Sequence, residues 1–291
     1  MYHFSKKFSF LLIFLFCTAC FVGHAAEPDW NQFRGPNHDN MAFSTDLLKT
    51  WPEGGPKLLQ EIEGLGDGYS NLSFDAKRIY TLGDIGDSCL VTALDRKTGK
   101  KLWSTPIGKS GQVGRYYGPR ATPATDGKTV FAFSQFGDFA SLDAETGKLN
   151  WCKNVSADFG GKYMNQWGYA SSPILEGDLV VLQIGGEKGT LAAFSRDGKI
   201  VWRSAELKED ASYATVVPAE IDGVRQFLLF TPAASPESTR KMENSSGTAN
   251  APVPVPSAVT RFIKTTWFTS LPVINTDVTA FASPKREPRS R

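Results

Sequence analysis

Four side chains carry the chemistry that stands out in the sequence: Tyr69, Arg120, Trp167 and Tyr169. They belong to or flank glycine-led motifs that recur every 50 residues, so we expect them at equivalent or nearly equivalent positions of a repeated structure. Aromatic rings stack on flat molecules, and a guanidinium both pairs with carboxylates and stacks on rings. The set predicts a binding site for a flat anionic ligand. The alternative is that the rings only fill space and Arg120 contacts a neighbouring loop.

Bulk composition and the other polar residues argue against several functions. A net charge of +2 on 291 residues does not give the concentrated basic surface of a nucleic-acid partner, so we expect none. Once a predicted leader is removed, His38 is the only histidine, and no multi-histidine metal site or Ser-His triad can be built. Cys89 and Cys152 are too few for a disulfide framework, and we expect both to pack as small apolar residues.

Two loops are superficially similar to ligand motifs. "GKSGQVG" (108–114) lacks the terminal Gly-Lys-Ser/Thr of a phosphate-binding loop. "DIGDS" (84–88) has only two carboxylates, which favours an ordinary hairpin turn over a calcium site. We therefore predict no metal site and no nucleotide site here.

A repeat of about 50 residues must position the candidate residues. "ALDRKTGKKLW" (93–103), "SLDAETGKLNW" (141–151) and the shorter "AFSRDGKIVW" (193–202) end in tryptophans 48 and 51 residues apart. The aspartate can accept backbone N–H groups just ahead of it, and the glycine can take the positive φ that a tight turn needs. We expect the indoles to wedge between neighbouring sheets. The structural repeat residues are Asp95, Gly99, Trp103, Asp143, Gly147, Trp151, Gly198 and Trp202.

A second marker recurs in step with the first and precedes a strand-like run each time. It reads "GYSNLS" at Gly68, "GPRATP" at Gly118, "GYASSP" at Gly168 and "SYATVV" at Ser212. Short strands with short turns favour propeller blades over a solenoid. The predicted fold is all-β: an incomplete β-propeller of four-stranded antiparallel blades, about three and a half of them, over residues 67–232. Residues 27–66 form an N-terminal segment ahead of the blades.

The pattern A-x-D-x-x-T-G-x-x-x-W resembles the tryptophan-docking repeat of the quinoprotein-dehydrogenase-like β-propellers. These are called PQQ-like repeat proteins, and the outer-membrane-protein assembly factor is among them. "WNQFRGPN" (30–37) is similar to the start of exported members, and the resemblance covers about residues 30–232. It implies a ring of seven or eight blades, with pyrroloquinoline quinone at the channel mouth as the candidate cofactor. The vicinal cysteine pair of true quinoprotein alcohol dehydrogenases does not occur here.

The N-terminus predicts export. A positive start, "MYHFSKK", precedes the apolar run "FSFLLIFLFCTACFVG" and the small-residue exit "GHAA", so residues 1–26 read as a signal peptide. We expect a periplasmic or extracellular protein with no transmembrane span after cleavage. Anchoring through acylated Cys20 is disfavoured, because Cys17 stands where a bulky aliphatic residue is usual.

The repeat stops near Ala233, and the tail over residues 233–291 has two interpretations. Its Pro- and Ser-rich composition is typical of disorder. A shifted reading frame is the other, since Met242 followed by Glu243 then forces Gly, and 234–247 can read V-T-G-I-D-A-K-D-G-K-L-L-W, another copy of the repeat. We favour a frameshift in the gene or its record.

Two functions follow. The first is a non-catalytic binding or assembly scaffold of the cell envelope, with envelope proteins or a small ligand at the channel mouth as partners. The alternative is a truncated quinoprotein dehydrogenase that uses pyrroloquinoline quinone. All specific motifs are packing signatures, which favours the scaffold.

Overall fold

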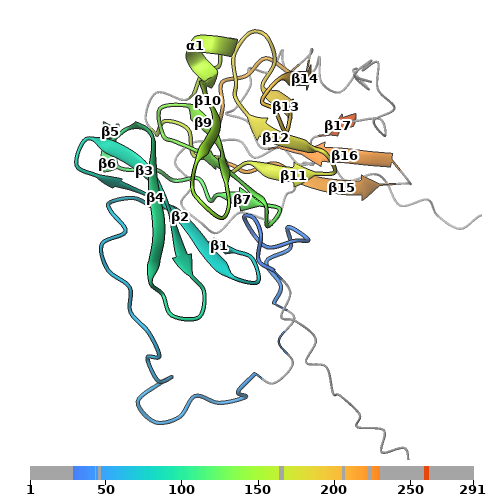
Figure 1. Ribbon diagram of the computed structural model, residues 1–291. Coiled ribbons are helices and arrows are strands. Elements are labelled where there is room, and N and C mark those ends of the chain that lie inside the picture. The colour runs from blue at the N-terminus through green and yellow to red at the C-terminus, as the bar shows by residue number, and fades with distance from the viewer. Residues whose placement is uncertain are drawn as a thin grey trace, which may run out of the picture.

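The computed structural model describes residues 29–42, 44, 47–163, 167–204, 207–221, 224–229 and 259–261. The predicted signal peptide lies outside these residues, as does the predicted tail apart from 259–261. Three four-stranded antiparallel sheets follow one another along the chain, and we call them blades 1, 2 and 3 (Figure 1). The predicted all-β fold class is confirmed.

Each blade is an antiparallel meander. Blade 1 comprises β1 (Ser73–Phe74), β2 (Arg78–Ile85), β3 (Ser88–Asp95) and β4 (Lys101–Lys109). Blade 2 comprises β7 (Ala124–Thr125), β8 (Thr129–Phe133), β9 (Asp138–Asp143) and β10 (Leu149–Asn154). Blade 3 comprises β11 (Ile174–Glu176), β12 (Leu179–Gln183), β13 (Leu191–Ser195) and β14 (Ile200–Arg203).

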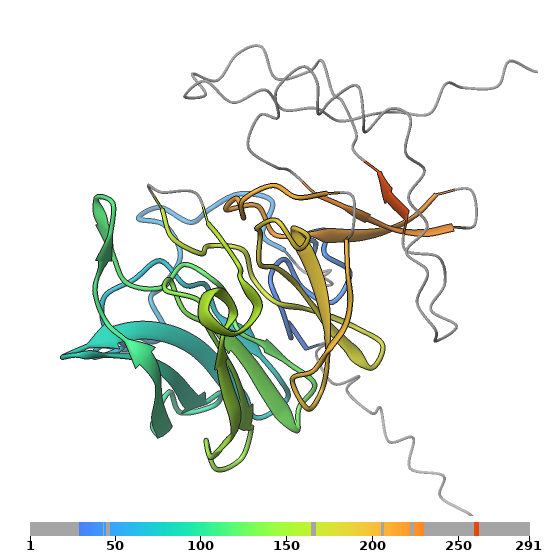
Figure 2. The ribbon, with the colours of Figure 1, turned by 90° about the horizontal axis from the view of Figure 1, so that it is seen from above.

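A fourth sheet departs from this plan. β15 (Val217–Ile221) and β16 (Val224–Leu228) pair antiparallel, whereas β17 (Val259–Arg261) lies parallel to β16. The view in Figure 2 shows the sheets succeeding each other in chain order around part of a ring. A small hairpin, β5 (Gln112–Val113) with β6 (Tyr116–Tyr117), interrupts the passage from blade 1 to blade 2. The helix α1 (Val155–Phe159), which was not predicted, follows blade 2 and is capped by Asn154.

The core consists of three layers, one between each pair of neighbouring sheets. Alternate side chains of a strand face opposite ways, so a middle strand buried on both faces can serve two layers. In β8, Val130 and Ala132 pack with Tyr80 of blade 1, while Phe131 and Phe133 pack with blade 3. Burying one such large apolar side chain contributes about 1.5–3 kcal/mol, so the blades are stabilised mainly by each other.

The tryptophans of the repeat lie between blades. Trp103 Nε1 donates to the Ala144 carbonyl of blade 2 at 3.2 Å, and a Cβ on Gly147 would lie 2.4 Å from the Trp103 ring. Trp151 repeats the contact one blade later, donating to the Arg196 carbonyl at 2.8 Å. Only glycine in the turn lets the indole approach this closely.

The first and the last contacts of this series differ from those made by Trp103 and Trp151. Trp202 packs against Phe227 of β16, with ring centroids 5.7 Å apart, and its Nε1 has no partner within the described part of the chain. On blade 1, Gln60 takes the place of an indole against Gly99, and its Nε2 donates to the Thr98 carbonyl at 2.8 Å.

The Asp-x-x-Thr-Gly turns are closed by their aspartates. Asp95 Oδ1 accepts from both the backbone N–H and the hydroxyl of Thr98, at 2.7 Å each, and Asp143 does the same with Thr146. These bonds to the ionised carboxylate lower the pKa of both aspartates. Asp197, in the shorter third copy, is instead held by Ser195 and Lys199. All three aspartates therefore serve turns.

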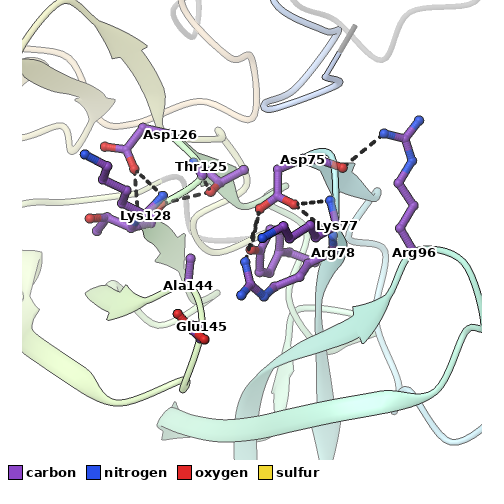
Figure 3. A network of polar contacts seen from close by, with 12 residues as sticks. Asp75, Lys77, Arg78, Arg96, Thr125, Asp126, Lys128, Ala144 and Glu145 are labelled. Atoms are coloured by element: carbon purple, nitrogen blue, oxygen red, sulfur yellow. Dashed lines mark hydrogen bonds and ion pairs between the residues drawn. The ribbon is translucent and has the colours of Figure 1, made fainter. Parts of the chain in front are cut away.

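A second set of turn aspartates joins the innermost strand to the next one (Figure 3). Asp75 accepts from the backbone N–H groups of Lys77 and Arg78 and from the hydroxyl of Tyr80. Asp126, 51 residues later, binds its own turn and also forms an ion pair with Arg196 of blade 3 at 3.0 Å. These turns fix where each innermost strand ends.

The N-terminal segment, residues 30–40, crosses the inner strands of three blades. Three consecutive residues each accept one backbone N–H: Trp30 from Phe74, Asn31 from Thr125, and Gln32 through Oε1 from Leu175, at 2.8, 2.8 and 2.9 Å. The donors belong to β1, β7 and β11 in turn. The segment thus ties the blades together at the inner side of the arc.

The two cysteines behave differently. Cys89 is fully buried, as predicted. The expectation that Cys152 packs as an apolar residue is wrong: it is exposed, and its Sγ lies 3.3 Å from the Ile107 carbonyl. It sits on β10, the outermost strand of blade 2, where the sheet edge faces solvent.

Candidate functional site

A pocket of about 350 Å³ lies where the four repeats begin, just ahead of their innermost strands. It draws residues from every repeat and from the N-terminal segment. The lining residues are Phe33, Tyr69, Asn71, Tyr116, Arg120, Trp167, Ala170, Ser172, Tyr213 and Thr215. Of the four predicted site residues, Tyr69, Arg120 and Trp167 come together here.

Four rings form a continuous row along the pocket, which we call the aromatic row: Tyr69, Tyr116, Trp167 and Tyr213. Tyr116 and Trp167 are stacked, with centroids 4.9 Å apart and planes 15° apart. Tyr69 meets Tyr116 edge-on at 5.8 Å, and Tyr213 meets Trp167 edge-on at 6.0 Å. Each neighbour holds the next in place, so the row is arranged before any ligand arrives.

Arg120 is fixed by backbone carbonyls. Its Nη1 donates to Gly118 at 2.7 Å, and its Nη2 donates to Tyr116 at 2.9 Å and to Val113 at 3.4 Å. These bonds hold the β5–β6 hairpin and thereby place the Tyr116 ring. Partial burial lowers the pKa of the guanidinium, which nevertheless stays charged. Arg120 is therefore both a support for the pocket wall and a cation within it.

Asp84 also helps to hold the β5–β6 hairpin, through a bond to the residue that precedes it. Its Oδ2 accepts from the Gly111 N–H and from Gln135 Nε2, both at 2.8 Å. Burial raises the pKa of this carboxyl, with the two hydrogen bonds acting in the opposite direction. The predicted hairpin at "DIGDS" is seen in the pairing of Ile85 with Ser88, whereas Asp84 itself bonds to Gly111 and Gln135 outside the turn.

The pocket floor is hydrogen-bonded from blade to blade. The Ser172 hydroxyl accepts the Thr122 N–H at 2.9 Å, and the Thr215 hydroxyl accepts the Ser172 N–H at 2.9 Å. Each bond joins corresponding places in successive repeats. Small hydroxyl residues in the "GPRATP", "GYASSP" and "SYATVV" motifs thus set the spacing of the pocket walls.

Tyr169 is not in the pocket, which corrects its expected position at the channel mouth. It is 1% exposed and lies between blades 2 and 3, where its hydroxyl donates to the Ile184 carbonyl at 3.1 Å. Gly137 makes room for the ring, since a Cβ there would lie 2.8 Å from Tyr169 Cε2. Burial raises the pKa of its phenol to about 12. Tyr169 is a core residue.

The sequence interpretation missed several lining residues, Tyr116 and Tyr213 above all. Tyr213 is the second residue of the fourth marker, "SYATVV", the same place that Tyr69 holds in the first marker, "GYSNLS". Tyr116 belongs to the "RYYGPR" stretch, whose two tyrosines gave no sign of which one faces inward. Phe33 belongs to the "WNQFRGPN" stretch, which gave no sign that this ring reaches a pocket.

Two further findings concern metal ligands and membrane-spanning helices in the described part of the chain. Over this part of the chain, no three His, Cys, Asp or Glu side chains are grouped closely enough to hold a metal ion. A separate finding is that none of the helices in the same residues has the length and apolar character to cross a membrane.

Together the blades and the pocket define a PQQ-like β-propeller repeat protein. A family model described as outer membrane protein assembly factor BamB matches residues 87–286, more than half of the chain. The chain belongs to this family. The matched range includes most of the tail, and the frameshift interpretation stays a prediction that the nucleotide sequence after the Phe230 codon would test.

Individual relatives match over shorter stretches. Outer membrane protein assembly factor BamB of Yersinia pestis is 31% identical over 129 residues, which is 43% of this chain and 30% of the relative. The chain therefore spans less than a third of that relative's length. The solved BamB of Moraxella catarrhalis is 19% identical with a TM-score of 0.36, covering 51% of this chain and 39% of that one. Quinohemoprotein alcohol dehydrogenase of Comamonas testosteroni is 20% identical with a TM-score of 0.41, covering 61% and 27%.

Proposed function

We propose that this protein is an exported, non-catalytic binding scaffold of the cell envelope, which uses the aromatic row as its recognition surface. One observation carries the proposal: four repeats contribute one ring each to a preformed row beside Arg120, whose donors largely hold the protein's own carbonyls. Rigid Tyr and Trp rings with a central Arg are the residues that dominate binding in protein interfaces.

Family membership supports the same function. The family model and the Yersinia pestis relative are described as outer membrane protein assembly factor BamB, and we take binding of other envelope proteins as the corresponding role of this chain. We place this protein in the periplasm or outside the cell on the predicted signal peptide. Tyr69 and Tyr213 are 59% and 50% exposed, so their faces are available to a partner.

A quinoprotein dehydrogenase is the second candidate, and the same pocket favours it. Stacked rings and a guanidinium suit the planar, carboxylate-bearing pyrroloquinoline quinone, for which Tyr69, Arg120 and Trp167 would be the binding residues. The quinone would supply the redox chemistry. The residues of this chain would only orient it and shield it from water.

Comigration with envelope proteins tests the scaffold. Purified full-length protein is mixed with detergent-solubilised outer-membrane proteins of the host and separated by size. The variant Tyr116→Ala/Trp167→Ala removes the stacked pair, while Tyr117→Ala is the matched control, since Tyr117 lies on the same hairpin but outside the pocket lining. We expect wild type and the control to comigrate with envelope proteins and the double variant to lose them.

Quinone binding tests the alternative. Pyrroloquinoline quinone and calcium are added to the wild-type protein, and the quinone absorbance is followed with and without an alcohol and a dye acceptor. A saturable spectral change with dye reduction, together with unchanged comigration of the double variant, would replace the scaffold by the dehydrogenase.

A further inference from the structure

A second pocket, of about 510 Å³, adjoins the first. Its lining residues are Trp30, Phe33, Arg34, Asn40, Asn71, Leu72 and Thr122. Phe33 and Asn71 line both pockets, so the two adjoin at these side chains. We call the combined space the two-pocket groove. Because both parts include Phe33 in their lining, a ligand that reaches both must pass this ring.

The groove is positively charged. Each pocket has one arginine in its lining, Arg120 in the first and Arg34 in the second, and neither lining includes an acidic residue. Asp84 is the carboxylate that acts on Arg120 through space, but its Oδ2 is taken by Gly111 and Gln135. A half-buried cation without an ion-pair partner is costly unless an anion joins it.

The guanidinium of Arg120 has N–H donors that the protein's own carbonyls do not use. Three of its five N–H groups go to carbonyls, which leaves Nε–H and one Nη1–H without a partner among the described residues. Arg34 is exposed, and its guanidinium has no hydrogen-bond or ion-pair partner within the described ranges. Both cations are therefore free to meet carboxylates.

A buried hydroxyl points independently to a ligand. Thr122 is 1% exposed and lines the second pocket, yet its Oγ1 has no hydrogen-bond partner in the described structure. An unpaired buried hydroxyl is unfavourable, and a polar atom of a ligand would give it a partner. The side-chain amides of Asn40 and Asn71 add donors and acceptors to the same lining.

We propose that the two-pocket groove binds an extended acidic segment of a partner polypeptide, with one carboxylate at Arg120 and another at Arg34. The aromatic row packs against the segment between its charges. The proposal rests on the scaffold function and names the chemistry of the partner. An extended segment can reach both parts of the groove past Phe33, and acidic residues match its two arginines.

Fluorescence anisotropy with defined peptides tests this. The probes are a labelled hexaglutamate peptide and a labelled hexaglutamine peptide of equal length, titrated with full-length protein at 50 and 200 mM salt. We expect the glutamate peptide to bind at least about tenfold tighter at low salt, with the difference shrinking at high salt. Equal affinity of the two peptides would overturn the proposal.

Charge variants locate the binding site. Arg34→Gln removes no side-chain bond within the described residues and should lower the affinity for the glutamate peptide several-fold, and Arg34→Glu should abolish the advantage of that peptide over the glutamine peptide. Arg115→Gln is the matched control, because Arg115 is exposed on the adjacent hairpin and does not line the groove. Equal loss in the control would show nonspecific charge attraction and overturn the site.

Two further outcomes separate this inference from the scaffold function. If glutarate competes as strongly, per molecule, as the hexaglutamate peptide, the groove takes small dicarboxylates and the polypeptide proposal fails. If the glutamate peptide has no advantage while Tyr116→Ala/Trp167→Ala still loses the envelope proteins, the acidic partner is wrong and the scaffold function stands.

Discussion

The indole N–H of Trp103 donates to the backbone carbonyl of Ala144, 41 residues farther along the chain and one blade away. Trp151 does the same to Arg196, 45 residues on. A blade therefore carries its ring on the outermost strand, and the next blade supplies the turn that receives it. Each interface depends on residues from two copies of the repeat.

Replacing Trp103 with alanine should destabilise the fold by about 3 kcal/mol, the low end of the cost of removing a buried large aromatic, since the ring is only partly buried. Trp103→Phe should cost less, because it keeps most of the ring and loses the hydrogen bond. Urea unfolding measures both. Trp51→Ala is the control: Trp51 is 71% exposed and its loss should change the unfolding free energy little. Equal effects at the two positions would contradict the docking role.

Gly147→Ala should destabilise more than Gly127→Ala. Both glycines have positive φ, 71° and 83°, so alanine at either costs about 1–2 kcal/mol of backbone strain. A Cβ at Gly147 would also strike the Trp103 ring at 2.4 Å, whereas nothing lies within 4 Å at Gly127. Thermal unfolding of both variants isolates the contact with the ring. Similar melting temperatures would show that the indole moves aside freely.

Tyr169→Phe should lower stability by about 1 kcal/mol through loss of the hydroxyl bonds to Ile184 and Ser156. It should leave peptide and envelope-protein binding unchanged, because the ring lies in the core. Denaturant unfolding and the comigration assay are the two measurements. A loss of binding at unchanged stability would return Tyr169 to the site.

The free energy of unfolding should fall as the pH drops below about 6.5, and protonation of His38 should cause part of this fall. Burial is the main cause that lowers the pKa of His38 from its ordinary 6.5; Arg225 and Arg34 act in the same direction, and Glu176 and Asp39 oppose them. Between the lowered pKa and 6.5 the unfolded chain binds more protons than the folded one, so acid favours unfolding.

The structural basis is the contact between His38 and Gln32, whose Nε2 atoms lie 3.2 Å apart. A protonated imidazole cannot accept from the amide, and Gln32 must then give up its orientation toward the Leu175 N–H. Unfolding free energies at pH 7.5 and 5.0 should differ more for wild type than for His38→Gln, whose amide can accept at either pH. An identical pH dependence would contradict this.

The repeat could be predicted from the sequence because its residues act locally. The Asp95 carboxylate binds Thr98 three residues away, so spacing alone specifies the turn. A tryptophan, Trp103 in the first copy, recurs with that turn. A large ring on the last strand of a blade can be buried mainly against the next blade. Fold class and blade boundaries follow from such short-range patterns.

The pocket could be predicted only in part. Tyr69 and Tyr169 stand in the same Gly-Tyr motif, yet one faces the pocket and the other the core. The difference depends on Gly137, 32 residues before Tyr169, which leaves space for a ring between the blades. The contact of Gly137 with Tyr169 joins distant parts of the chain, so the Gly-Tyr motif alone contains no pattern that predicts it. The same holds for Phe33, which reaches the pocket only because residues 30–32 bind three innermost strands.

That attachment at residues 30–32 has a consequence for the order of assembly. These residues leave the ribosome before any blade does, and their partners Phe74, Thr125 and Leu175 emerge afterwards in the same sequence. Each of the three blades therefore finds its docking point already present when it is made. Residues 30–32 thus give blades 1, 2 and 3 a common attachment that exists before any of them folds.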